Sequence, residues 1–237
     1  MNVEIENVDL NKNARIAGLV YFFIIAIGMI NNLFVLNGVL SPNDITKTTS
    51  NIIAKISVFR LSIVLDLLMF LMVTFLSVSL YSLLRSVNKN MALIGFAFRF
   101  GESILGGVYV LLSLCILTVV NTKEIMTMNT MEQINSYIQF FVNLKNISFN
   151  VLIIFMGVGA TIFCWLFYKS KFIPRIISVW GMVTYILMTI ISFAALLFSN
   201  LPTSIVIAVM APSSLFEITI GLWLCIRGIK TPNKKMI

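Results

Sequence analysis

The sequence predicts an all-α membrane protein, a six-helix transmembrane bundle with both termini in the cytoplasm. Three observations predict this fold: 59% of the 237 residues are hydrophobic, only 11% are charged, and the apolar residues gather in six long stretches. Soluble domains carry about 25% charged residues, so the composition excludes a water-soluble fold. Disordered, collagen-like and disulfide-stapled chains are excluded as well, because the chain is too apolar and has only 12 glycines and 3 cysteines.

Each apolar stretch exceeds the ~18 residues that mark a membrane-spanning helix. Helices are favoured over barrel strands, because the stretches show no period-two alternation and backbone groups in hydrocarbon must be bonded within the segment. We expect a single membrane domain over residues 1–237. Its predicted spans are residues 16–36, 61–84, 92–120, 147–168, 176–197 and 203–226.

The first stretch is predicted to be a permanent span, because it is longer than the apolar region of about 7–15 residues in a secretion signal. After it, Ser41-Pro42-Asn43-Asp44 predicts a turn, and a short surface helix through Ile52, Ile53 and Ile56 is expected to follow.

The long segment 121–146, between the third and fourth spans, allows two interpretations. Either the fourth helix begins early, or a separate amphipathic helix lies on the outer surface. Both rest on helical spacing of Ile134, Ile138, Phe141 and Lys145.

Lysine and arginine set the predicted orientation, because positively charged loops stay in the cytoplasm. Most of the 17 basic residues flank one membrane face. The cytoplasmic set is Lys12, Arg15, Arg85, Lys89, Lys169, Lys171, Arg175, Arg227, Lys230, Lys234 and Lys235, and the outer set is Lys47, Lys55, Arg60, Lys123 and Lys145. The net charge of +8 is therefore a topology signal with a weak attraction to anionic lipids, and we expect no nucleic-acid partner.

The residue types present exclude several kinds of chemistry. Histidine is absent, which excludes histidine-ligated haem, zincin-type metal sites and imidazole-based triads. Cys115, Cys164 and Cys225 lie in apolar stretches without a C-x-x-C pair, so we interpret them as small buried apolar side chains. We expect no metal, no cofactor and no catalytic residue of these classes.

Four ionisable residues lie at membrane depth, where each costs about 2.5–3.5 kcal/mol on insertion scales and therefore usually faces the bundle interior. They are Asp66, Arg99, Glu102 and Glu217. The third span places two of them on one helical stripe, formed by Gly95, Arg99, Glu102, Gly106, Tyr109 and Ser113. Its glycines permit close approach of another helix.

The sixth span carries Glu217 near its middle, close to Pro212, Ser213 and Ser214. Counted from the inner ends at ~1.5 Å per residue, Arg99 and Glu217 lie at similar depths. We therefore predict a bridge between Arg99 and Glu217, with Glu102 beside it.

Asp66 is expected nearer the outer end, within reach of Arg60, and Ser213, Ser214 and Tyr109 are expected to support the site. Acidic residues outnumber basic ones among the ionisable residues at membrane depth, even when Arg60 is counted. At least one carboxyl group must therefore be protonated or must bind a cation. A structural latch between helices is the alternative role for these charges.

Short motifs occur along nearly the whole chain, and their order resembles that of a known family. They are Ala14-Arg15-Ile16-Ala17-Gly18-Leu19, Phe59-Arg60-Leu61 with Asp66, Leu80-Tyr81-Ser82-Leu83-Leu84, Val87-Asn88-Lys89, Phe98-Arg99 with Glu102, Ser170-Lys171-Phe172-Ile173-Pro174-Arg175, and Glu217 before Gly221-Leu222-Trp223-Leu224 and Gly228. The chain resembles the bacterial integral membrane family called domain of unknown function 4386. The resemblance implies a six-helix, multi-pass protein of the bacterial inner membrane, and it implies no activity.

Three classes of function remain open. The leading one is a transporter-like or receptor-like bundle that handles a small molecule or an ion at Arg99, Glu102, Glu217 and Asp66. The second is a regulatory or scaffold component without a substrate. The third, an intramembrane enzyme with paired carboxyls, requires Glu102 and Glu217 to reach one substrate atom. The lipid bilayer is the partner that the sequence predicts directly.

Overall fold

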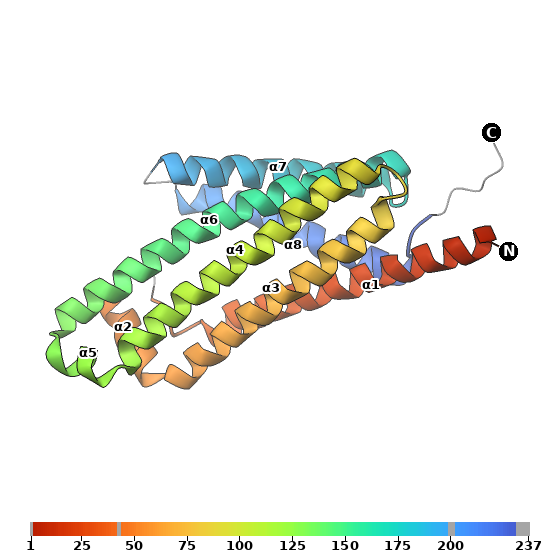
Figure 1. Ribbon diagram of the computed structural model, residues 1–237. Helices are drawn as coiled ribbons and strands as arrows, with labels where there is room; N and C mark the ends of the chain where they lie inside the picture. Colours follow the sequence, from red (N-terminus) through yellow and green to blue (C-terminus); the bar gives the residue numbers. More distant parts are fainter. Residues whose placement is uncertain (1, 42–43, 199–201, 231–237) are drawn as a thin grey trace.

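The computed structural model describes residues 2–41, 44–198 and 202–230. Within these ranges the chain forms no strand, and six helices are long and apolar enough to cross a membrane, which confirms the predicted all-α fold (Figure 1). The six helices are α1 (Asn2–Ile30), which continues into the π-helix η1 (Asn31–Val35), α3 (Ile56–Leu84), α4 (Lys89–Asn121), α6 (Met131–Ser170), α7 (Arg175–Leu197) and α8 (Thr203–Ile226).

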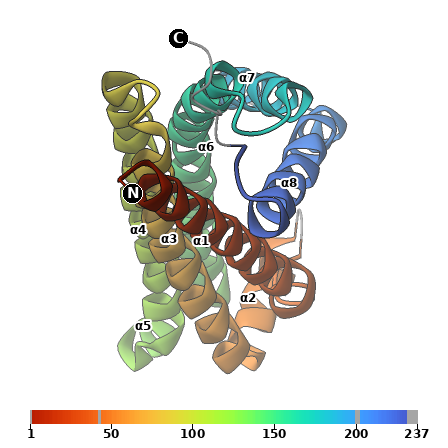
Figure 2. The ribbon, with the colours of Figure 1, turned by 90° about the vertical axis from the view of Figure 1, so that its right-hand side faces the viewer.

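The six long helices pack as a closed ring. Going round it, α1 contacts α3, α3 contacts α4, α4 contacts α6, α6 contacts α7, α7 contacts α8, and α8 returns to α1 (Figure 2). In this order α4 and α8 stand opposite each other. Side chains on the inner stripes of the helices therefore meet in the middle of the ring.

Glycines bring the first and last helices of the ring close together. A Cβ atom placed on Gly18 of α1 would lie 2.6 Å from the backbone nitrogen of Cys225 and 2.8 Å from the carbonyl oxygen of Gly221 in α8. Only a residue without a side chain fits such an approach of two backbones, as is common where membrane helices meet. Gly18 and Gly221 both belong to the motifs that carry the family resemblance.

The two long segments between spans adopt helices at the end of the bundle opposite to the start of α1 and the end of α8 (Figure 1). A short helix is present where the surface helix was predicted, as α2 (Ile45–Ala54), but Ile56 already belongs to α3 and Ile52 is buried. The Asp44 side chain caps α2 by accepting a hydrogen bond of 2.8 Å from the Lys47 backbone. Pro42 and Asn43 of the predicted turn lie outside the described residues. Of the two interpretations of residues 121–146, the early start is right, because α6 runs without interruption from Met131, after the short α5 (Lys123–Met128).

The loops between α3 and α4 and between α6 and α7 lie at the same end of the bundle. The start of α1, the end of α8, the α3–α4 loop and the α6–α7 loop all lie there (Figure 1). Two hydrogen bonds connect them: the Ile229 backbone donates to Asn11 Oδ1 at 3.1 Å, and the Lys230 backbone donates to the Phe172 carbonyl at 2.9 Å. We call this the basic end; Lys234 and Lys235 lie outside the described residues.

Candidate functional site

The buried stripe of α4 is the foundation of the site. Gly95, Arg99, Glu102, Gly106 and Ser113 are buried as the helical spacing predicts, and Tyr109 is half-buried. Arg99 and Glu102 are each only 3% exposed, and Arg99 Nη1 lies 2.7 Å from Glu102 Oε2. The two charges are therefore paired within one helix, in the i,i+3 relation that places side chains one turn apart.

Opposite this pair, other helices contribute polar side chains to the same interior. Tyr185 of α7 is completely buried, and its hydroxyl donates a hydrogen bond of 2.9 Å to Glu217 Oε1 of α8. The charge of Arg99 acts on Tyr21, Tyr185 and Glu217 as well as on Glu102. We call these five side chains, Tyr21, Arg99, Glu102, Tyr185 and Glu217, the central cluster.

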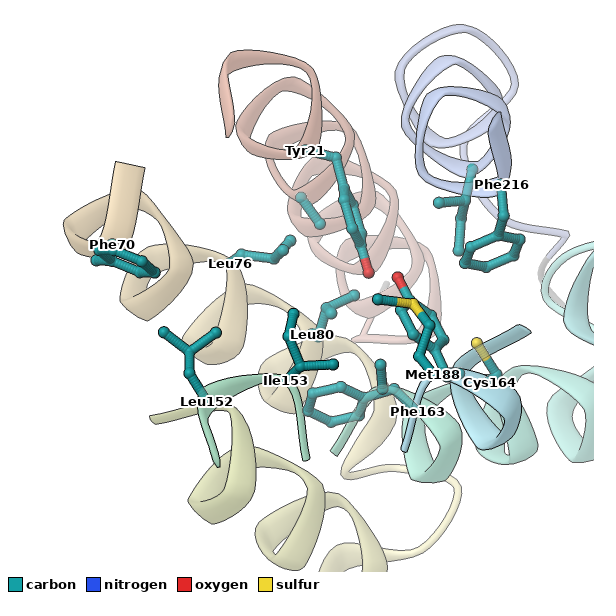
Figure 3. Packing of buried hydrophobic residues seen from close by; sticks show 14 of the residues in the cluster. Tyr21, Phe70, Leu76, Leu80, Leu152, Ile153, Phe163, Cys164, Met188 and Phe216 are labelled. Atoms are coloured by element: carbon teal, nitrogen blue, oxygen red, sulfur yellow. The ribbon is translucent and has the colours of Figure 1, made fainter. Parts of the chain in front are cut away.

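Apolar side chains surround the central cluster. Figure 3 shows Tyr21 of α1 pointing its hydroxyl into the ring interior, where Phe163 and Cys164 of α6, Met188 of α7 and Phe216 of α8 converge. The ring of Phe216 packs edge-on against Tyr185, with centroids 5.5 Å apart. The ring contact with Phe216 and the hydrogen bond to Glu217 orient the Tyr185 side chain.

The predicted bridge from Arg99 to Glu217 is wrong. No ion pair joins these two described residues, since Arg99 binds Glu102 and Glu217 accepts from Tyr185. The reason lies in the ring, because α4 and α8 are opposite members and neither is a ring neighbour of the other in the described structure. The two residues face the same interior from its two sides, and their charges interact without contact.

Several atoms of the central cluster have no hydrogen-bond partner within the described part of the chain. Arg99 Nε and Nη1 and Glu102 Oε2 are buried in this way; the short Nη1–Oε2 approach is close enough for an ion pair but lacks hydrogen-bond geometry. With Arg99 and Glu102 neutralising each other, Glu217 leaves the ionised cluster with one excess negative charge. The cluster is thus chemically suited to a proton or a cation, with N–H donors beside it.

Asp66 belongs to a different group of side chains, nearer the opposite end of the bundle. Asn31 Nδ2 donates to Asp66 Oδ1 at 2.6 Å, and the charges of Asp66 and Lys145 act on each other. The Lys145 ammonium lies 4.2 Å from the centroid of the Tyr109 ring. Asn31, Asp66, Tyr109 and Lys145 are called the second cluster below.

Several expectations for the supporting residues change accordingly. Arg60 does not reach Asp66, because its side chain is exposed on another face of α3. Tyr109 joins the second cluster and not the central one, since it lies about 10 Å further along α4 than Glu102. Ser213 is buried and Ser214 exposed, and both donate to the Met210 carbonyl of their own helix, so neither contacts Glu217 through these bonds.

Lys145 was expected at the outer membrane face and is instead 8% exposed inside the bundle. A signal for this position exists in the sequence, because Lys145 continues the stripe of Ile134 and Ile138, and both of these isoleucines are fully buried. Tyr21, Asn31 and Tyr185 were also missed. As uncharged residues in apolar helices, they give no signal without knowledge of which helices are neighbours.

The comparison with known families agrees with this architecture. A family model described as "Domain of unknown function (DUF4386)" matches residues 16–228. The chain belongs to this family. All residues of the central cluster and the second cluster lie inside the matched range, and so do the close-packed Gly18 and Gly221. No curated protein and no solved structure matches the chain.

Proposed function

We propose that this DUF4386 protein lies in the bacterial inner membrane with its basic end in the cytoplasm, and that it handles a proton, a small cation or a cationic small molecule at the central cluster. One observation carries the proposal. Arg99 is already paired with Glu102, so Glu217 is an acidic group without a basic partner in the ring interior. Such a group takes up a proton or attracts a cation.

The geometry argues against a purely structural latch. An ion pair that ties two helices together needs its members on different helices, whereas Arg99 and Glu102 both belong to α4. Charged groups at membrane depth are costly, and this pair offers no cross-helix connection in return. A functional role explains why the charges are present.

The charged residues of the central cluster differ in burial. Glu217 is partly exposed in the described structure, whereas Arg99 and Glu102 are buried. Because the orientation follows from positively charged loops, the basic end is expected to face the cytoplasm.

The test is ion flux into vesicles that contain the purified protein. Proton uptake is followed with an enclosed pH-sensitive dye while a sodium or potassium gradient is imposed. We expect Glu217→Gln to reduce the flux at least tenfold while thermal unfolding in detergent stays close to that of the unmodified protein. The matched control is Glu132→Gln, which removes an exposed carboxylate from α6 and should leave the flux unchanged.

Two outcomes would contradict the proposal. Unchanged flux together with a lower unfolding temperature in Glu217→Gln would assign Glu217 to the structural latch. The absence of protein-dependent flux of protons, sodium or potassium, combined with no binding of any of these ions to the purified protein, would remove ion handling.

A scaffold role is the second candidate, and the opposite end of the bundle favours it. There, α4, α5 and α6 enclose a hollow of about 420 Å³ lined mainly by apolar groups, among them Val119, Ile125 and Phe141. At the same end of the bundle, Met128 of α5 is 82% exposed and Phe140 of α6 is 58% exposed. A protein that copurifies in mild detergent, and is lost when Met128 and Phe140 are both changed to serine, would support this role.

A further inference from the structure

The second cluster contains two buried oxygen atoms without a donor. Asn31 Nδ2 donates both to the Ser62 carbonyl at 3.2 Å and to Asp66 Oδ1 at 2.6 Å. This fixes the orientation of the amide, because the reversed amide would set its oxygen against two other oxygens. Asn31 Oδ1 and Asp66 Oδ2 then have no hydrogen-bond partner among the described residues, although the two side chains are only 1% and 7% exposed.

Unpartnered oxygens of this kind are ligands for a hard cation. Buried carboxylate and amide oxygens without a donor are costly, and carboxylate and carbonyl oxygens are the ligands that cations such as sodium prefer. Divalent ions usually require more acidic ligands, and within the described ranges no three histidine, cysteine, aspartate or glutamate side chains gather. The donor set therefore fits a monovalent cation.

Lys145 is a tethered cation beside these oxygens. Its charge acts on Asp66, yet these two described residues do not form an ion pair. The ammonium lies over the Tyr109 ring instead, an arrangement that attracts a cation to the aromatic face. Four flexible carbons connect the ammonium to the helix, so it is able to move between the ring and the carboxylate.

We propose that Asn31 and Asp66 form a binding site for a small monovalent cation, and that the Lys145 ammonium competes with this cation for Asp66. With the cation bound, Lys145 stays on the Tyr109 ring; without it, the ammonium moves to the carboxylate. This site is separate from the central cluster, since Tyr109 lies about 10 Å from Glu102 along α4.

The test measures thermal unfolding of the full-length protein in detergent while choline chloride is replaced by sodium chloride or potassium chloride at constant ionic strength. We expect the unfolding temperature to rise with the concentration of at least one of the two metal cations. In the Glu217→Gln background, where the central cluster no longer contributes, Asp66→Asn should abolish the rise. Lys145→Met should shift its midpoint to a concentration about tenfold lower, because a like charge no longer opposes the cation.

Two control variants make the result specific. Lys123→Met removes an exposed lysine from α5 and should leave the midpoint unchanged. Glu217→Gln removes the carboxylate to which the proposed function assigns a cation, so any rise that remains in this variant belongs to Asn31 and Asp66. That remaining rise should still respond to Lys145→Met, so failure of this proposal is distinguishable from failure of the proposed function. If Asp66→Asn does not fold, the lower midpoint concentration expected for Lys145→Met still tests whether the ammonium competes with the cation.

Three results would overturn the proposal. The first is an unfolding temperature that does not respond to sodium or potassium in either the unmodified protein or Lys145→Met. The second is a response that Glu217→Gln abolishes, which would place the cation in the central cluster. The third is a midpoint that Lys145→Met leaves unchanged, since the ammonium would then not compete.

Discussion

Loss of one member of the Arg99–Glu102 pair should destabilise the protein more than loss of both. Glu102→Leu leaves the guanidinium of Arg99 in a site where it is 3% exposed and where Nε and Nη1 already have no hydrogen-bond partner. A buried charge that loses its ion-pair contact costs about 3–5 kcal/mol, and Glu217, which makes no ion-pair contact with Arg99, offsets only part of this. The double variant Arg99→Met, Glu102→Leu removes both charges and fills the space with apolar side chains. Replacements of this type are often neutral or stabilising.

The assay is denaturant unfolding in detergent micelles of the unmodified protein, the single variant and the double variant. We expect the unfolding free energy to fall by several kcal/mol in Glu102→Leu and to return close to its original value in the double variant. Glu132→Leu, at an exposed position of α6, controls for the change of residue type.

A double variant as unstable as Glu102→Leu would refute this reasoning. It would mean that the pair stabilises the fold through its shape or its contacts to other helices and not through mutual neutralisation. The structural-latch interpretation would then be favoured over the proposed function.

Two further predictions test the packing of the ring and of the central cluster. Gly18→Ala should separate α1 from α8 and cost about 1–3 kcal/mol in thermal unfolding, because its Cβ would lie 2.6 Å from a backbone atom of α8. Gly107→Ala, which has nothing within 4 Å of its Cβ, should be neutral or slightly stabilising, and equal effects at the two positions would contradict the prediction. Tyr185→Phe removes the hydroxyl that donates to the α8 carboxylate and should cost about 1.5–3 kcal/mol. Tyr137→Phe, at an exposed position, should cost almost nothing in the same assay, and a loss as large as that of Tyr185→Phe would contradict this prediction.

Hydropathy and helical periodicity predict the parts of this structure that depend on one helix at a time. Each predicted span lies within one of the six long helices or ends within one residue of it. The polar stripe of α4 faces protein as its spacing indicates. These features are local, because a run of apolar residues fixes a span and a repeat near 3.6 residues fixes a face.

Partners on different helices were harder to predict, because membrane helices are apolar on nearly all sides. Lipid chains and packed side chains are equally apolar, so the hydrophobic pattern does not indicate which helices are neighbours. Equal depth suggested an Arg99–Glu217 bridge, but depth alone does not give position around the ring. The i,i+3 partner on the same helix was available to Arg99 whatever the arrangement of the other helices.

The burial of the Arg99–Glu102 pair depends on residues with no charge at all. One turn before Arg99, Gly95 leaves room for the ring of Phe163 of α6, which would lie 3.0 Å from a Cβ at this position. One turn after Glu102, Gly106 leaves room for the ring of Phe70 of α3, which a Cβ would overlap.

The rings of Phe163 and Phe70 therefore cover the buried stripe of α4 before and after the ion pair. Beneath the pair, Gly159 of α6 leaves space for the Arg99 side chain itself, since a Cβ there would lie 2.8 Å from Arg99 Cγ. The charged pair is buried at this depth because three glycines, Gly95, Gly106 and Gly159, allow the neighbouring helices to pack closely around it. The small residues of α4 and α6 are for this reason as much a part of the site as the charges that they surround.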